Sequence, residues 1–111
     1  MKYRVLFIFA LLALCSNVQA APPVAPVVVY SVVGNRATAH WLPVESSNGY
    51  RLYWLSYPMP NPLGSINNVD LGAEAQVSAV LEEGAMYYVA ITAYNQDGES
   101  GFSNIEVIAI N

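Results

Sequence analysis

The chain has 111 residues, which is room for one ordinary domain. It is 55% hydrophobic and 11% charged, and its formal net charge is −4. Phosphate binding needs Lys and Arg side chains that displace counterions, so this charge balance disfavours nucleic acid and anionic membrane surfaces as partners.

The first twenty residues form the pattern of a secretory signal. Lys2 and Arg4 make a positive start, and residues 5–14 are an unbroken apolar run. Small side chains close the segment, with Ala20 at its end, so we expect cleavage between Ala20 and Ala21 and a secreted or periplasmic product.

Two other fates of this segment are weaker. Ten apolar residues span only about 15 Å as a helix, short of a bilayer core of about 30 Å, which disfavours an uncleaved anchor. Lipidation at Cys15 would need a small residue before the cysteine, and Leu14 stands there instead. We expect no membrane insertion after cleavage.

The expected mature chain is acidic and free of cysteine. Its 91 residues hold eight acidic side chains and two arginines, a net charge of −6. Without cysteine it has neither a disulfide nor a thiolate metal site, so the hydrophobic core alone must stabilise it.

Residues 21–26 contain three prolines and predict an extended lead-in to a domain over residues 27–111. Apolar residues then alternate or are β-branched over short runs separated by turn signals, and no helical period appears. A loop with Pro58, Pro60 and Pro62 interrupts them. The predicted strands are residues 27–33, 36–41, 50–54, 66–71, 77–81, 87–94 and 103–110, typical of an all-β, seven-stranded antiparallel immunoglobulin-like sandwich.

The order of several motifs resembles the fibronectin type III family, and especially its bacterial members. Trp41 and the segment 49–53 are similar to the family's B and C strands, and residues 87–104 are similar to its F strand, FG loop and start of G. Leu81, Gly84 and Tyr87 resemble its tyrosine corner, where the resemblance implies that the Tyr87 hydroxyl bonds back to the backbone.

Two positions depart from the family's pattern. Glu83 stands where many members carry proline before the corner glycine, and Ile105 separates Asn104 from Glu106, where the family pattern has them adjacent. We expect the extra residue to form a bulge that shifts the register of the last strand.

Large inward side chains predict the core. Trp41 is the largest on its strand and is expected to fill the middle of the sandwich, with the corner closing one end. The predicted core residues are Trp41, Tyr50, Leu52, Leu81, Tyr87, Val89 and Ile91.

The sequence offers no catalytic, metal or cofactor site. His40 is the one histidine of the expected mature chain and is predicted to face solvent, while the acids are scattered and Glu82–Glu83 are expected at a solvated corner. Residues 95–99 lack the ligand spacing of a calcium loop, and no nucleophile elbow or phosphate loop is present. We therefore expect no enzymatic activity.

The remaining chemistry lies on the surface. Tyr53, Tyr88 and Tyr94 are predicted to point outward from neighbouring strands as an aromatic stripe, and the adjoining loop adds Tyr57 and Met59. Such stripes stack on sugars or bury against proteins, although tyrosine is also common on strands for its β-propensity.

Three functions fit these features. The first is an exported interaction module that docks on an envelope or extracellular protein. The alternatives are a carbohydrate-associated module that uses the tyrosines, and a structural subunit of a filament or matrix joined by its N-terminal prolines or by strand pairing across chains.

Overall fold

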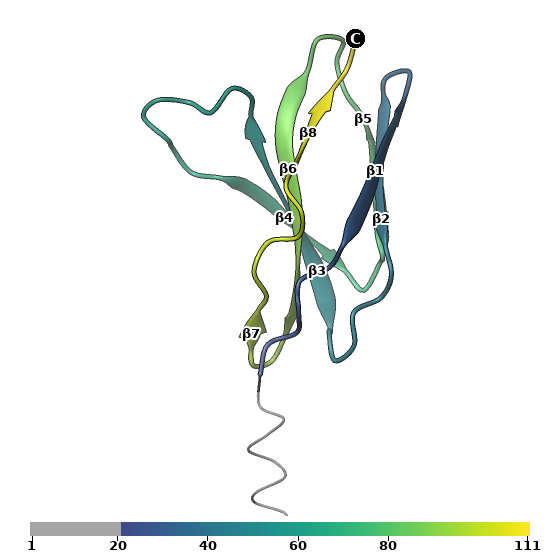
Figure 1. Ribbon diagram of the computed structural model, residues 1–111, viewed down its shortest axis with the longest axis vertical. Helices are drawn as coiled ribbons and strands as arrows, with labels where there is room; N and C mark the ends of the chain where they lie inside the picture. Colours follow the sequence, from purple (N-terminus) through teal and green to yellow (C-terminus); the bar gives the residue numbers. More distant parts are fainter. Residues whose placement is uncertain (1–20) are drawn as a thin grey trace, which may run out of the picture.

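The computed structural model describes residues 21–111 as two antiparallel sheets packed face to face (Figure 1). The predicted signal segment and its cleavage site at Ala20 lie outside the described residues. The three-stranded sheet has the order β1-β2-β5, and the five-stranded sheet has the order β4-β3-β6-β7 with β8 also paired to β6. The strands are β1 (Val28–Val33), β2 (Arg36–Trp41), β3 (Gly49–Ser56), β4 (Asn67–Gly72), β5 (Gln76–Val80), β6 (Met86–Asn95), β7 (Gly98–Glu99) and β8 (Glu106–Ala109).

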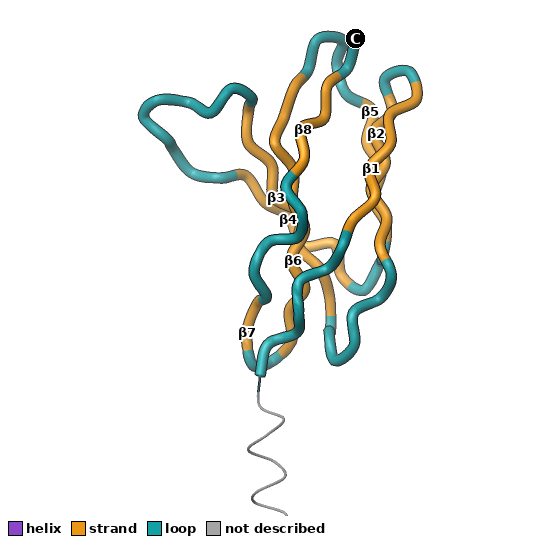
Figure 2. Tube along the Cα trace, viewed as in Figure 1, coloured by secondary structure: helices purple, strands orange, loops and turns teal. Residues whose placement is uncertain are grey.

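This arrangement confirms the predicted all-β sandwich. Loops and turns make up the rest of residues 21–111, and the longest loop projects between β3 and β4 (Figure 2). Within this part of the chain, no helix is long and apolar enough to cross a membrane.

Side-chain alternation sets the faces of each strand, because successive strand residues point to opposite sides. On β2, Ala39 and Trp41 are buried, whereas Arg36 and His40 are exposed. The preceding turn requires Gly34, whose φ is 60°.

The last strand differs from the prediction. Residues 103–110 were expected to form one strand, but β7 and β8 are two pieces of an edge strand separated by residues 100–105. Tyr94 pairs with Glu99 and Val89 with Glu106, so β6 spans five residues where the edge strand spans seven. Two extra residues are accommodated here, where the sequence pattern suggested one.

Two serine hydroxyls hold this break against β6. Ser100 N donates to Ala93 O (2.7 Å) and Ser103 N to Ile91 O (2.8 Å). In return, Ala93 N donates to Ser100 Oγ (2.9 Å) and Ile91 N to Ser103 Oγ (2.8 Å). The hydroxyls replace the carbonyl acceptors of a regular ladder, so residues 100–105 can arch away from the sheet. We call this segment the serine arch.

The core is centred on Trp41 and Tyr50, whose rings meet edge to face at 5.2 Å. Ile91 and Ala93 are fully buried beside them, and Leu52 packs against this cluster while only half-buried. The Tyr50 hydroxyl also accepts a hydrogen bond from Val44 N (2.8 Å) and so fixes the loop before β3.

The predicted core residues at the corner are less buried. Leu81, Tyr87 and Val89 are half-buried and line a cavity between the sheets. The expected bond from the Tyr87 hydroxyl to the corner backbone is wrong, since no hydrogen bond to that hydroxyl is found within residues 21–111. Backbone bonds close the corner instead: Gly84 N donates to Ile110 O and Ile110 N to Ala85 O, both at 2.9 Å.

Candidate binding surfaces

The outward face of the five-stranded sheet carries two aromatic pairs. Tyr53 meets Phe102 of the serine arch edge to face, with ring centroids 5.0 Å apart. Tyr57, in the loop after β3, lies against Tyr88 of β6 at 5.1 Å. Tyr53 pairs with Ala90 in the register, so Tyr88 is its diagonal neighbour and the two pairs adjoin.

Val107 of β8 extends this surface, because it lies directly opposite Tyr88. Several members are exposed to solvent: Tyr57 by 43%, Phe102 by 48% and Val107 by 44%. We call the set Tyr53, Tyr57, Tyr88, Phe102 and Val107 the aromatic patch. Met59, which is 55% exposed, follows two residues after Tyr57 in the loop.

Tyr94 does not join this patch, which corrects the predicted stripe. Its hydroxyl donates to Asp70 Oδ1 (2.8 Å), which also accepts from Gly72 N (2.8 Å). A Cβ at Gly49, opposite Tyr94, would collide with the tyrosine ring. The glycine therefore lets the Tyr94 ring cross β3 toward Asp70. On β6, the Tyr94 backbone lies about 13 Å along the strand from Ala90.

The middle of the outward face is already covered. Ala90 and Thr92 are only 5% and 2% exposed, although they point outward. Glu99 Oε2 accepts hydrogen bonds from the Tyr53 hydroxyl and from Thr92 Oγ1, the latter at 2.6 Å. Burial, followed by the hydrogen bond to Glu99, raises the pKa of Tyr53 above its ordinary value of 10.0.

The sequence prediction missed Phe102 and Val107. Phe102 stands just before the predicted strand 103–110, and nothing local indicates that it lies against Tyr53. The serine pair that forms the arch, Ser100 and Ser103, was the available signal, because a hydroxyl at each point of the break can replace a ladder acceptor.

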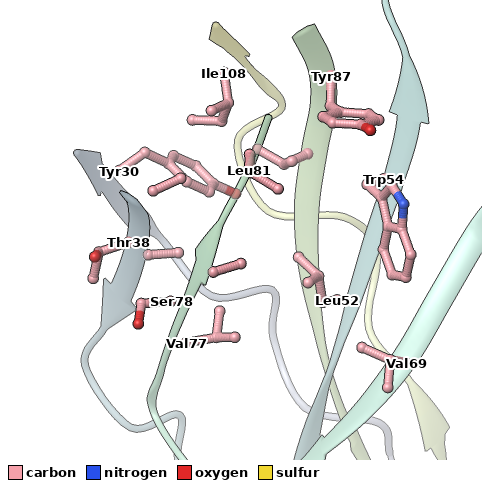
Figure 3. Close-up of a pocket in the computed structure, with 14 residues that line it drawn as sticks. Tyr30, Thr38, Leu52, Trp54, Val69, Val77, Ser78, Leu81, Tyr87 and Ile108 are labelled. Carbon is pink, nitrogen blue, oxygen red and sulfur yellow. The ribbon is translucent and has the colours of Figure 1, made fainter. Parts of the chain in front are cut away.

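A cavity of about 290 Å³ lies between the two sheets (Figure 3). None of its lining side chains is charged. Small side chains create part of the space, with Ala37 and Ala39 on β2 and Ala79 on β5.

The Tyr30 hydroxyl belongs to a residue that lines this cavity, and it is buried without a hydrogen-bond partner among the described residues (Figure 3). Ser103 lies close to it, but the Ser103 hydroxyl accepts from Ile91 N and donates to Asn104 O (3.1 Å), and no hydrogen bond of normal geometry joins it to Tyr30. Burial raises the pKa of Tyr30, so the phenol stays protonated and can donate.

A groove of about 540 Å³ separates the edge strands β1 and β8. Asn104 crosses one end of it: Val28 N donates to Asn104 Oδ1 (2.9 Å), and Asn104 Nδ2 donates to Val28 O (3.0 Å). The backbone groups of Val28 therefore point away from β2. By the alternation of an antiparallel ladder, those of Tyr30 and Val32 point the same way.

The described residues bring together no group of three or more His, Cys, Asp or Glu side chains that could hold a metal ion. His40, Glu82 and Glu83 are exposed. The side-chain Nδ2 of Asn95 donates hydrogen bonds to Ala21 O (3.1 Å) and Ser46 O (3.0 Å). These bonds tie the start of the lead-in to the β6–β7 turn.

Comparison with known proteins identifies the fold. No family model matches the chain. A Kelch domain-containing protein of Saccharolobus solfataricus is 32% identical over 87 residues, which cover 76% of this chain. The chain spans only 11% of that relative's length.

Three solved structures share the architecture. They are the fn3 domain of human contactin 1 (TM-score 0.67, 18% identity, 82% of this chain and 81% of that one), the third fibronectin III domain of human KIAA0343 protein (TM-score 0.66, 22% identity, 82% and 84%) and the FN5 domain of Drosophila Lar (TM-score 0.62, 16% identity, 79% and 96%). The predicted resemblance is thereby confirmed at the level of the fold.

Proposed function

From the fibronectin type III fold of residues 21–111, we propose that this protein is an exported, non-catalytic module that binds a protein partner at the cell envelope or outside the cell. The N-terminal pattern of Lys2, Arg4 and the apolar run 5–14 supports export. The aromatic patch is the binding surface. The net charge of −6 after residue 20 argues against nucleic acid as the partner.

The exposed position of Phe102 carries this proposal. The serine arch interrupts an edge strand, and Phe102 within it is half-exposed beside Tyr53. Exposed aromatic side chains are enriched in protein interfaces, and rings held by neighbours lose little conformational entropy when a partner covers them. The patch is therefore preorganised for contact with an apolar surface.

Protein is favoured over sugar as the ligand. Rings that bind sugars offer a free flat face, whereas Tyr53 and Tyr57 are each engaged with a second ring. The Tyr53 hydroxyl is also committed to Glu99. The patch therefore offers few free hydrogen-bonding groups to a carbohydrate. It offers exposed apolar area to a protein.

Affinity capture with matched variants tests the proposal. The full chain, tagged at its C-terminus, is expressed in its native host, and proteins bound to it are identified by mass spectrometry. We expect one envelope or extracellular protein with the wild type and with Leu42→Ala, because Leu42 is 86% exposed and outside the patch. Phe102→Ala should lose that protein at unchanged melting temperature. Capture that survives Phe102→Ala combined with Tyr57→Ala would rule out the patch.

A second candidate function is self-assembly by strand addition, which the groove between β1 and β8 favours. Two edge strands face this groove, and an extended segment of another copy would find the outward backbone groups of Tyr30 and Val32. Sedimentation at rising concentration tests it. Assembly should weaken in Val32→Pro, which removes one outward N–H, and a monomer at all concentrations would exclude this function.

A further inference from the structure

We propose that β1 pairs with β1 of a second copy of this chain, antiparallel and centred on Ser31, so that two three-stranded sheets join into one across a two-fold axis. This inference rests on the second candidate function, self-assembly by strand addition, and names the strand that is added and its register. The surface is separate from the aromatic patch, which lies on the five-stranded sheet.

The outer backbone groups of β1 are open. In its sheet β1 is hydrogen-bonded only to β2, and no strand lies between β1 and β8 (Figure 1). Trp41 N, opposite Val28 in the register, donates to Ala75 O on the β5 side, so this pair is not bonded across β1 and β2. By alternation, Tyr30 and Val32 present their N–H and C=O groups to the groove beside β1. No hydrogen bond to these groups is found within residues 21–111.

β1 also lacks the features that protect edge strands from pairing with other chains, namely charged residues, prolines and bulges. Residues 27–35 contain no charged side chain, and β1 is made of Val and Tyr apart from Ser31, without a proline or a register shift. Three other edge segments each carry an acid: Asp70 on β4, Glu99 on β7 and Glu106 on β8. β1 is therefore the edge best suited to accept another chain.

The remaining edge strand, β5, is unsuited to pairing with its own copy. Its middle residue is Ser78, and acids flank both of its ends. An antiparallel pair centred on Ser78 would bring Glu74 of one copy opposite Glu82 of the other, and like charges in opposite positions destabilise a pair of strands.

Asn104 selects the register of the β1 pair. It already bonds both outer groups of Val28, which leaves the groups of Tyr30 and Val32 free. A two-fold antiparallel pair that uses only these residues places Tyr30 of each copy opposite Val32 of the other and forms four hydrogen bonds. Ser31 then lies opposite Ser31 of the second copy. A shift of two residues would need the groups that Asn104 holds or would reach the turn at Gly34.

The side chains of β1 fit this register. Val29 of one copy lies opposite Val33 of the other, and these valines are 56% and 78% exposed in the single chain. Ser31 is a small residue at a close pair, where the Cα atoms are about 4.5 Å apart. The contact is short compared with a standard interface, so we expect a dimer that forms only at high protein concentration.

Sedimentation of the full chain at rising concentration should show a monomer–dimer equilibrium. Ser31→Lys places two like charges opposite each other on the two-fold axis and should weaken dimerisation at least tenfold. Gln76→Lys adds the same charge at an exposed position on the outward face of β5 and should dimerise like wild type. Circular dichroism checks that both variants fold.

Cysteine crosslinking measures the register. In a Cys15→Ala background, which has no other cysteine, Ser31→Cys should form disulfide-linked dimers under mild oxidation, because the Cα atoms of such a pair lie within disulfide range. Val33→Cys alone should stay largely unlinked. A mixture of Val29→Cys and Val33→Cys should link.

The outcomes separate this proposal from the functions proposed above. A monomer at all concentrations would overturn both β1 pairing and self-assembly. Unweakened dimers of Ser31→Lys, or linked Val33→Cys without linked Ser31→Cys, would overturn β1 pairing alone. Growth beyond dimers would do the same, because two-fold pairing uses the β1 edge of both copies. Ser31→Lys should still capture the partner of the aromatic patch, and loss of that capture would overturn the separation of the two surfaces.

Discussion

Asn104 bonds both backbone groups of Val28, accepting from its N–H at 2.9 Å and donating to its carbonyl at 3.0 Å. The two residues lie 76 positions apart: Val28 is on β1, an edge strand of one sheet, and Asn104 is in the serine arch beside the other sheet. The side chain thus takes the place of a neighbouring strand and closes one end of the open side of the sandwich.

We expect Asn104→Ala to lower the free energy of unfolding by about 1–2 kcal/mol, because both backbone groups of Val28 lose their protein partner. Urea denaturation followed by circular dichroism measures the change. Asn67→Ala, at an exposed asparagine of β4, is the control and should stay within about 0.5 kcal/mol of wild type. Equal midpoints for the two variants would contradict this role of Asn104.

Ser103→Ala should destabilise the fold by about 1–3 kcal/mol. Ser103 is 6% exposed, and its hydroxyl accepts from Ile91 N, which would remain buried without a partner. Ser56→Ala, at an exposed strand position, should have little effect. Hydrogen exchange gives a specific readout: the Ile91 amide should exchange faster in Ser103→Ala, and unchanged protection of that amide would refute the serine arch.

Trp41→Ala should cost about 3–5 kcal/mol, because Trp41 is 5% exposed and packs edge to face on Tyr50. Its indole Nε1 is buried without a hydrogen-bond partner among the described residues. Trp41→Phe, which keeps an aromatic ring and removes that donor, should therefore cost less than Trp41→Ala. Thermal unfolding measures both, and equal losses would show that ring packing is not the main contribution.

Removal of a hydroxyl should distinguish two core tyrosines. Tyr50→Phe loses the bond from Val44 N and should cost about 1 kcal/mol. Tyr87→Phe loses no hydrogen bond within residues 21–111 and should change stability by less than about 0.5 kcal/mol. Chemical denaturation of the pair tests this, and a larger loss for Tyr87→Phe would restore the tyrosine corner that the sequence predicted.

Asp70 makes stability depend on pH in acid. The Gly72 N–H and then the Tyr94 hydroxyl lower its pKa below the ordinary value of 3.8. Because the folded pKa is the lower one, this contribution is fully present above pH 3.8 and is lost as the pH falls through the folded pKa. Midpoints measured from about pH 6 to pH 2 should fall less steeply in Asp70→Asn than in wild type. Asp97→Asn, on the β6–β7 turn, is the control and should follow wild type.

The sequence predicted the sandwich and most strand positions because these depend on local pattern. Alternation along β2 placed Ala39 and Trp41 inward and His40 outward, as found. The last strand could not be predicted in the same way. Serine hydroxyls stand in for ladder carbonyls only when β6 lies beside them, and β6 comes from an earlier part of the chain.

The candidate site was predicted only in part for the same reason. Tyr53, Tyr57 and Tyr88 lie in the aromatic patch, while Tyr94 turns toward Asp70 because Gly49 leaves it space. Strand alternation gave each tyrosine its face. It carried no information on which residue would stand beside each ring.

By itself, the sequence determined the two-sheet fold and the inward side of each strand, because turn residues and the period of two act over a few neighbouring residues. Only the tertiary structure decided what covers the outward face and what stays empty inside. The Tyr53–Glu99 contact joins residues 46 positions apart, and the cavity lies where small side chains of the neighbouring strands β2 and β5 face the other sheet. Such packing is fixed when distant segments meet, and no local pattern encodes it.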